Sequence, residues 1–321
     1  MIVLESSRLR LTLDPGRGAQ WSALEARREA GAGDWTSLVP DCREDAPRPR
    51  AGQDESVPLA AASFHMIPYS NRVRDGRFAF AGTVHELPEP GRHAIHGVVR
   101  KRPWRVAPAG AGSDGPGAGG GGPVDGGRAR CTFESAEHED VGWPWPIGCA
   151  VEHELDGSTL VATMSVTNRG DSPMPAGLGW HPYFVREVAG AGPTLTLPVD
   201  AVFPDADGDC LPDGPPVALP DALDFRAARA LDPHRHIDRC LAGLDGAVRV
   251  EWPGTGFGLT MRADAVCRFL VLFNPAAPHF AVEPVTNAND AFNLAARGID
   301  GGARTLAPGE TLRATLRLEL D

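Results

Sequence analysis

The feature that most limits how this chain can fold is an alternation of apolar and polar residues with a period of two. In residues 160–168, Leu160, Ala162, Met164 and Val166 share one predicted face, and threonine and serine residues share the other. Other strand-like runs cover residues 8–13, 128–134, 149–155, 247–252, 258–262, 269–273 and 311–320. Many strands without alternating helices predict an all-β fold, a large antiparallel β-sandwich with few short helices.

Turn and helix signals complete this prediction. Asp156-Gly157 predicts a tight hairpin turn, and residues 76–86 predict a hairpin around Ala81-Gly82. Helical periodicity is scarce, and residues 222–231 are the stretch for which we predict a short helix. Residues 201–236 are rich in proline and aspartate, so we expect an excursion from the core there.

Two further stretches are predicted to be loops. Residues 40–58 are polar and proline-rich, whereas residues 107–128 are dominated by glycine, alanine and proline and predict a flexible insert between strands. Residues 115–120 match G-x-G-x-x-G, but no strand precedes them and no helical pattern follows, which argues against a dinucleotide site. We predict one domain over residues 1–321, because a large β-sandwich can reach this length.

The charge balance excludes several classes of partner. The net charge is 31 − 42 = −11, and the pI is about 5.4. Such an acidic chain is not expected to bind nucleic acid or an anionic membrane surface, and it fits a neutral small-molecule ligand. The single lysine, Lys101, lies in neither a Schiff-base nor a P-loop motif, which argues against both chemistries.

The cysteines and the N-terminus predict a cytoplasmic protein. The six cysteines are scattered without a C-x-x-C motif, so we expect reduced and mostly buried thiols. Residues 1–5 lack the basic and apolar regions of a signal peptide, and no run is long and apolar enough to span a membrane. The oligomeric state is left open between monomer and homodimer.

Two stretches place a carboxylate and an imidazole in apolar surroundings. Glu283 follows a predicted buried strand, and Pro284 is expected to end or bulge the short strand that carries it. His181 lies in residues 177–184, which we interpret as an aromatic, glycine-flanked turn. Together they are a candidate acid–base pair, and an ionised Glu283 should favour the protonated form of His181.

These stretches and several others, in this order, resemble the aldose 1-epimerase (mutarotase) family. The matching segments are Pro68 to Val73, His96-Gly97, Gly142 to Trp145, Asn168, Gly177 to Phe184, Asp238, His279 to Asn287, Asn289 to Asn293 and Pro308 to Glu310. The resemblance implies the large twisted β-sandwich of mutarotases. It also implies an isomerase that interconverts the α and β anomers of a free hexose by acid–base ring opening and reclosure, without a metal or organic cofactor.

The resemblance assigns roles to residues of both stretches. Glu283 would be the catalytic base that removes the proton of the anomeric hydroxyl, and His181 the acid that protonates the ring oxygen. His96 would hold the sugar near its ring oxygen, and Gly97 would let the backbone approach the ligand closely.

The same resemblance implies further sugar-binding residues. Arg72 could grip vicinal hydroxyls with its planar guanidinium, and Asn71 is a second candidate that could instead cap the turn. Asp238 would accept hydrogen bonds from sugar hydroxyls, with Asp232 and Asp245 as alternatives. Aromatic residues that could stack on the sugar or fill the core are Trp143, Trp145, Trp180 and Tyr183.

Other functions stay open on the sequence alone. A hexose-6-phosphate mutarotase would need a basic pocket, for which the candidates are Arg74, Arg77, Arg100 and Arg102. A non-catalytic carbohydrate-binding β-sandwich would have no need of both His181 and Glu283. A glycoside hydrolase would need a second carboxylate opposite Glu283, and none is evident.

A metal site is the remaining alternative. His93 with His96, or His234 and His236 with Asp238, could supply nitrogen and oxygen ligands. Neither group has a recognised zinc spacing, so we expect no metal.

Overall fold

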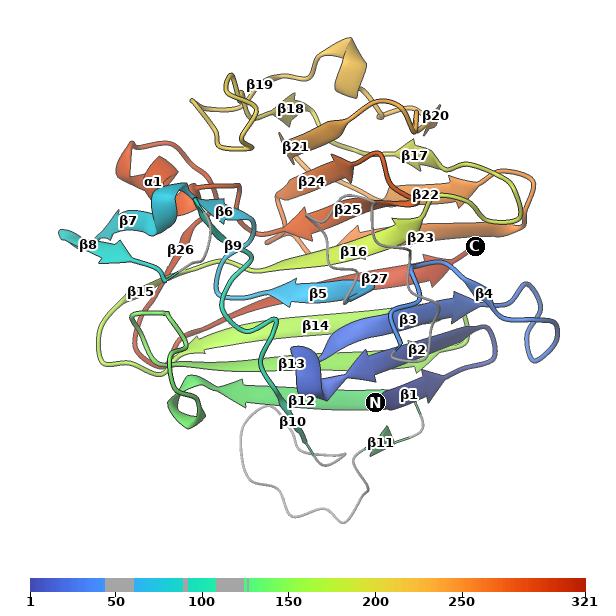
Figure 1. Cartoon of the computed structure of the whole chain (residues 1–321), viewed down its shortest axis with the longest axis horizontal. Helices are drawn as coiled ribbons and strands as arrows, with labels where there is room; N and C mark the ends of the chain where they lie inside the picture. Colours follow the sequence, from blue (N-terminus) through green and yellow to red (C-terminus); the bar gives the residue numbers. More distant parts are fainter. Residues whose placement is uncertain (44–60, 89–91, 108–123, 126) are drawn as a thin grey trace.

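The computed structural model describes residues 1–43, 61–88, 92–107, 124–125 and 127–321. In this part of the chain, two large antiparallel sheets pack on each other, and the remaining strands form small pairs (Figure 1). The predicted all-β sandwich is therefore confirmed. The predicted loops at residues 40–58 and 107–128 lie largely outside the described residues, and the single domain stays a prediction.

The first sheet has 11 strands within the described residues. In spatial order they are β1 (Ile2–Glu5), β2 (Leu9–Asp14), β3 (Gln20–Ala26), β5 (Ser63–Met66), β16 (Gly179–Val185), β25 (His279–Val285), β24 (Phe269–Asn274), β21 (Ile237–Ala242), β18 (Ala201–Val202) and β19 (Val217–Ala218), with β4 (Thr36–Ser37) beside β3.

The second sheet has 10 strands within the same residues. Their order is β10 (Arg105–Val106), β12 (Arg128–Glu134), β13 (Ile147–Asp156), β14 (Thr159–Asn168), β27 (Thr311–Leu320), β23 (Phe257–Ala263), β22 (Val248–Trp252), β17 (Thr194–Thr196) and β20 (Arg229–Ala230), with β11 (Val124–Asp125) beside β12.

Short elements complete the described fold. Three strand pairs are β15 (Met174–Ala176) with β26 (Arg304–Leu306), β6 (Arg72–Val73) with β9 (Ala94–Ile95), and β7 (Arg77–Phe80) with β8 (Thr83–Glu86). The helices are α1 (Ala291–Ala296) and the 3₁₀ turns η1 (Pro15–Arg17), η2 (Arg74–Gly76), η3 (Ser135–Glu137) and η4 (Asp221–Leu223). The predicted β7–β8 hairpin is confirmed, with Ala81 and Gly82 at positive φ between its strands.

Both faces of the first sheet are buried at β16 and β25. Inner-face residues that join the main core between the sheets are Trp180, Phe184, Phe280 and Val282. Tyr183 and Ala281, which are opposite each other in the register, belong to a second apolar cluster on the outer face. Because side chains alternate along a strand, His181 and Glu283 also lie on this outer face.

The prediction that Pro284 ends or bulges its strand is wrong. β25 continues past Pro284, which pairs with Leu270 of β24 without a shift of register. The pairing of β25 with β16 is interrupted instead, over the interval that contains His181, Pro182 and Glu283. Proline has no N–H to donate, so the irregularity falls on one side of a central strand rather than at its end.

The predicted helix over residues 222–231 is also wrong. That stretch contains the end of η4 and the short strand β20, which pairs with β17. The carboxylate of Asp224 accepts a hydrogen bond from the backbone N–H of Arg226 at 3.0 Å. Such local side-chain bonds offer the backbone an alternative to the helix, and here the alternative prevails.

A buried polar contact joins the two sheets beneath the outer face. The indole Nε1–H of Trp21 in β3 donates to Nε2 of His153 in β13 at 2.8 Å. His65 in β5 lies beside them, with ring centroids 5.7 Å from His153 and its Nδ1 3.4 Å from the carbonyl oxygen of Gly18. Since an indole N–H only donates, Nε2 of His153 accepts and this imidazole is neutral; since a carbonyl only accepts, Nδ1 of His65 carries a proton that it donates.

Candidate functional site

His181 and Glu283 meet at the centre of the outer face of the first sheet. The register that pairs Gly179 with Val285 and Tyr183 with Ala281 puts them opposite each other on β16 and β25. Nε2 of His181 lies 3.2 Å from Oε1 of Glu283, and the two side chains are 5% and 1% exposed. The sequence placed His181 in a turn; it lies instead in a strand, which fixes its backbone relative to Glu283.

Burial dominates the charge state of this pair. Removal from water, reinforced by the negative charge of Asp238, raises the pKa of Glu283 well above its ordinary value, and the positive charge of Arg72 opposes the rise. Burial likewise lowers the pKa of His181 to about 3. Burial therefore favours the neutral forms of both groups, in which the pair carries one proton and no net charge, and it opposes the effect that an ionised Glu283 is expected to have on His181.

Aromatic rings enclose the imidazole of His181. Phe64 of β5 stacks on it with centroids 4.5 Å apart, and Tyr183 lies at 4.5 Å in a tilted arrangement. The ring of His96 meets it edge-on at 5.1 Å. This apolar surrounding is the physical reason for the lowered pKa of His181, and it leaves Nδ1 of the imidazole without a hydrogen-bond partner.

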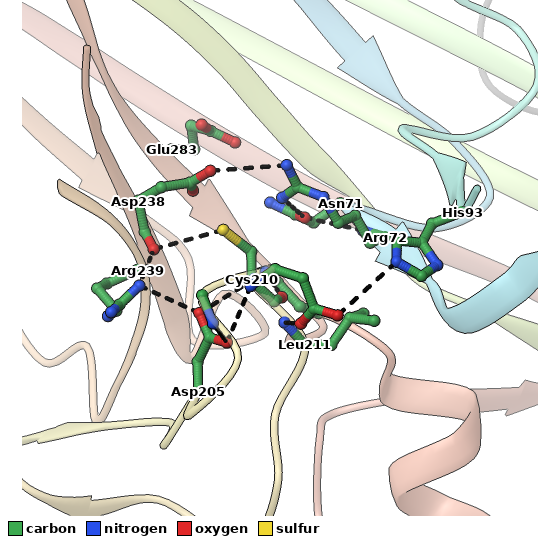
Figure 2. A network of polar contacts seen from close by, with 12 residues as sticks. Asn71, Arg72, His93, Asp205, Cys210, Leu211, Asp238, Arg239 and Glu283 are labelled. Atoms are coloured by element: carbon green, nitrogen blue, oxygen red, sulfur yellow. Dashed lines mark hydrogen bonds and ion pairs between the residues drawn. The ribbon is translucent and has the colours of Figure 1, made fainter. Parts of the chain in front are cut away.

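Arg72 and Asp238 form the polar edge of the site next to Glu283 (Figure 2). Nη2 of Arg72 lies 3.7 Å from Oδ2 of Asp238, and both side chains are partly exposed. Asn71 adopts a positive φ of 53°, and its Oδ1 accepts from the backbone N–H of Arg72 at 2.8 Å and from Nη1 of Arg72 at 3.3 Å. Asn71 thus caps the turn and orients Arg72; direct contact of Asn71 with a sugar stays a prediction.

His96 reaches the site from the segment that follows β9. Its backbone N–H donates to the carbonyl of Asn71 at 2.9 Å, which links it to the Arg72 segment, and its Nδ1 lies 3.0 Å from Sδ of Met66. Burial, followed by the influence of His181, lowers the pKa of His96 well below its ordinary value. A Cβ at Gly97 would lie 2.0 Å from the carbonyl oxygen of Ile67, so the glycine permits a close approach between two backbone segments, and its approach to a ligand stays a prediction.

The structure thus brings five predicted residues to one face or its edge: Glu283, His181, His96, Arg72 and Asp238. Among the candidate aspartates, Asp238 belongs to the site because it faces the guanidinium of Arg72, whereas Asp232 accepts a hydrogen bond from the backbone N–H of His234. Sequence reasoning missed Phe64, Met66 and His279. Their apolar or strand-end positions gave no local signal, because only the pairing of β5, β16 and β25 brings them to the site.

The tryptophans mostly fill the core. Trp143 and Trp145 pack with Phe78 in an aromatic cluster under β7 and α1, and Trp180 is buried between the sheets. Tyr183 is the predicted aromatic residue that faces the site. Stacking on a sugar therefore remains a prediction for Tyr183.

The structure bears on the expectations about metal ligands, membrane spans and cysteines. Within the described residues, no group of three or more His, Cys, Asp or Glu side chains is arranged to hold a metal ion. None of the helices in the described part is long and apolar enough to cross a membrane. All six cysteines are free thiols, and five are buried, as predicted.

The chain is similar to known proteins over most of its length. A family model described as aldose 1-epimerase matches residues 34–319. The uncharacterized protein YphB of Escherichia coli K12 is 27% identical over 296 residues, which are 87% of this chain and 90% of YphB.

Solved structures share the fold. A galactose mutarotase-like protein from Clostridium acetobutylicum is 16% identical with a TM-score of 0.80, over 99% of this chain and 94% of that one. A galactose 1-epimerase from Lactobacillus acidophilus NCFM is 17% identical with a TM-score of 0.72, over 99% and 93% of the two chains. At these identities the likeness shows a common fold.

Proposed function

Since the chain belongs to the aldose 1-epimerase family, we propose that it interconverts the α and β anomers of a free hexose. The observation that carries the proposal is the buried pair of His181 and Glu283, 3.2 Å apart on the outer face of the first sheet. A strongly perturbed carboxylate beside a strongly perturbed imidazole is typical of a site for proton transfer.

The single proton of the pair supplies an acid and a base at once. When Glu283 is ionised and His181 protonated, the carboxylate removes the proton of the anomeric hydroxyl and the imidazolium protonates the ring oxygen. When the proton resides on Glu283, the two residues exchange these roles. Both arrangements have the same net charge, so moving between them brings no additional net charge into the apolar site.

The chemical steps balance without any external reagent. As the hydroxyl proton leaves and the ring oxygen gains one, the bond between the anomeric carbon and the ring oxygen breaks and an aldehyde forms. The aldehyde carbon rotates, the former ring hydroxyl attacks its other face, and the two protons return by the reverse transfers. Acid and base catalysis of this kind contribute about 10²- to 10⁴-fold each. The steps call for no metal or organic cofactor.

Substrate binding falls to the residues at the edge of the site. Arg72 donates to sugar hydroxyls and Asp238 accepts from them, and their ion pair keeps the two side chains extended toward each other. His96, a neutral imidazole in this apolar surrounding, contributes a hydrogen bond near the ring oxygen. Asn71 orients Arg72 through the bonds to its backbone and guanidinium.

A second candidate is a sugar that carries a phosphate, and one observation favours it. The guanidinium of Arg100 lies over the ring of Phe64, 5.3 Å from its centroid, and Phe64 stacks on His181. Its positive charge adds to burial in lowering the pKa of His181, so it acts on the acid–base pair directly, where it would meet an anionic substituent. The other arginines proposed for a basic pocket also have partners: Arg74 pairs with Asp290, Arg77 pairs with Glu86, and Arg102 donates to backbone carbonyls.

Polarimetry tests the proposal directly. Freshly dissolved α-glucose and α-galactose should reach their equilibrium rotation faster with the protein, in proportion to its concentration, after the spontaneous rate is subtracted. Sugar binding without acceleration for either sugar would indicate a non-catalytic carbohydrate-binding protein instead.

A comparison of sugars then separates the two candidates. If the substrate is a sugar phosphate, α-glucose 6-phosphate should give a higher kcat/KM than α-glucose, and Arg100→Met should remove that preference. Methionine has a similar length and keeps contact with Phe64 while it removes the charge. Equal effects of Arg100→Met on both sugars would favour the free hexose.

A further inference from the structure

Asp205 is a buried carboxylate that the proposed mechanism does not use. Its side chain is 5% exposed, and it lies between β18 and β19 at the start of residues 205–213, here called the 205–213 turn. The carboxylate accepts backbone N–H groups from Gly208 at 2.9 Å, Asp209 at 3.2 Å and Cys210 at 3.0 Å. It therefore organises the turn from within.

The same carboxylate connects the turn to Asp238 (Figure 2). Nη1 of Arg239 donates to Oδ2 of Asp205 at 3.1 Å and to the backbone carbonyl of Asp238 at 2.9 Å. Sγ of Cys210 lies 3.5 Å from that carbonyl. The backbone of Asp238 is thus held from two directions, both of which depend on Asp205.

The turn is held by these contacts rather than by intrinsic preference. Cys210 has a φ of +61°, a region that residues other than glycine rarely occupy. Its carbonyl accepts a hydrogen bond from Nδ2 of Asn289 at 2.7 Å, which fixes the other side of the turn. A residue stays in such a conformation only when the contacts around it hold it there. The contacts of Cys210 include the backbone of Asp238, at the proposed sugar-binding edge of the site.

We propose that Asp205 is a positioning residue for sugar recognition, which acts through Arg239 to fix Asp238 opposite Arg72. The inference rests on the proposed function and adds to it, because Asp205 and Arg239 touch neither Glu283 nor His181 in any contact described above. Their loss should weaken the hold on sugar hydroxyls and leave proton transfer intact.

The first variant is Asp205→Asn. Asparagine has the same shape, but one acceptor oxygen becomes an NH₂ group that faces N–H donors of the turn or of Arg239. Because hydrogen bonds to charged groups are the strong ones, we expect KM for α-glucose or α-galactose to rise about 10-fold or more. The value of kcat should stay within about 3-fold of wild type, since the acid–base pair is unchanged.

The second variant, Arg239→Gln, leaves the three turn N–H bonds to Asp205 and removes the link to Asp238. It should raise KM in the same way, and the double variant should be no worse than the more severe single one, because both changes break one bridge. Arg239→Lys keeps the positive charge and should recover part of the affinity. If Asp205→Asn fails to fold, Arg239→Gln and Arg239→Lys carry the test.

The matched control is Asp224→Asn. Asp224 also holds a local backbone N–H and an arginine, Arg226, but on an exposed segment. It should leave KM and kcat unchanged. Folded Asp205→Asn and Arg239→Gln proteins with wild-type KM, even with lowered thermal stability, would overturn the positioning role, as would a fall in kcat at constant KM. A wild-type protein without mutarotase activity would instead overturn the proposed function, and the positioning role with it.

Discussion

The buried histidines between the sheets predict that the protein loses stability as the pH falls from 7 to 5. Burial lowers the pKa of His65 to about 4, whereas a histidine in the unfolded chain titrates near about 6.5. Between these values the unfolded chain binds more protons than the folded one, so stability declines as the pH drops through this window. For His65 alone, the linkage relation gives a loss of about 2 kcal/mol at pH 5.

His153 acts in the same direction. Burial, and to a smaller extent the neighbouring His65, lowers the pKa of His153 well below its ordinary value. Protonation of its Nε2 would place an N–H against the indole N–H of Trp21, so the hydrogen bond of 2.8 Å would be lost. The total loss between pH 7 and pH 5 should therefore exceed the share of His65.

Urea unfolding followed by tryptophan fluorescence at the two pH values measures this loss. His65→Gln can still donate to the carbonyl of Gly18 but does not titrate, so the difference in unfolding free energy between pH 7 and pH 5 should shrink by about 2 kcal/mol. The exposed His234, changed to glutamine, is the control and should leave the difference unchanged. If wild type and His65→Gln showed the same difference, the assignment of His65 as a buried neutral residue would be refuted.

Three further predictions concern catalysis. Glu283→Gln should lower kcat at least about 10²-fold with a modest change in KM, and near-normal turnover in the folded variant would contradict its role. The rate should depend on pH as a bell-shaped curve with a broad plateau, because burial lowers the pKa of His181 and raises that of Glu283. The acidic limb should report the binding of a second proton to the pair, and the basic limb should report the loss of its only proton. His181→Asn should then remove the acidic limb and most of the rate, and loss of the basic limb instead would reverse this assignment. Dialysis against a chelator should leave the activity unchanged, and activity restored by zinc would point to a metal site.

Much of the fold could be predicted because strand periodicity is local. β12 has the predicted bounds, and β14 and β27 differ from theirs by at most one residue, since their side chains alternate without interruption. Two errors came from reading a residue without its neighbours. Pro284 is tolerated inside a central strand because β24 still pairs with it, and Asp224 prevents a helix through a contact that periodicity does not detect.

The candidate site was predictable only in part. Glu283 stood out as a carboxylate on a short apolar strand and His181 as an imidazole in an aromatic, glycine-flanked stretch, and Arg72 and His96 came from the family resemblance. Their charge states could not be predicted, because the pKa values depend on burial by Phe64 and Tyr183 from other parts of the sheet. Asp205 gave no signal either, since residues 201–236 showed only a polar composition typical of a surface excursion.

The strand pairing that carries Glu283 and His181 separates them from most of the residues proposed to hold the sugar. The acid and the base lie on two central strands backed by the main core, whereas Arg72, His96 and the 205–213 turn belong to connections and short peripheral strands. Asp238 is the exception, because it lies on β21 of the same sheet. Insertions and substitutions in such connections are tolerated far better than changes in buried strands. Substitutions in these connecting segments can therefore change which sugar the protein accepts, while the acid–base pair stays unchanged. A search for variants with an altered substrate range should randomise those segments and keep β16 and β25 as they are.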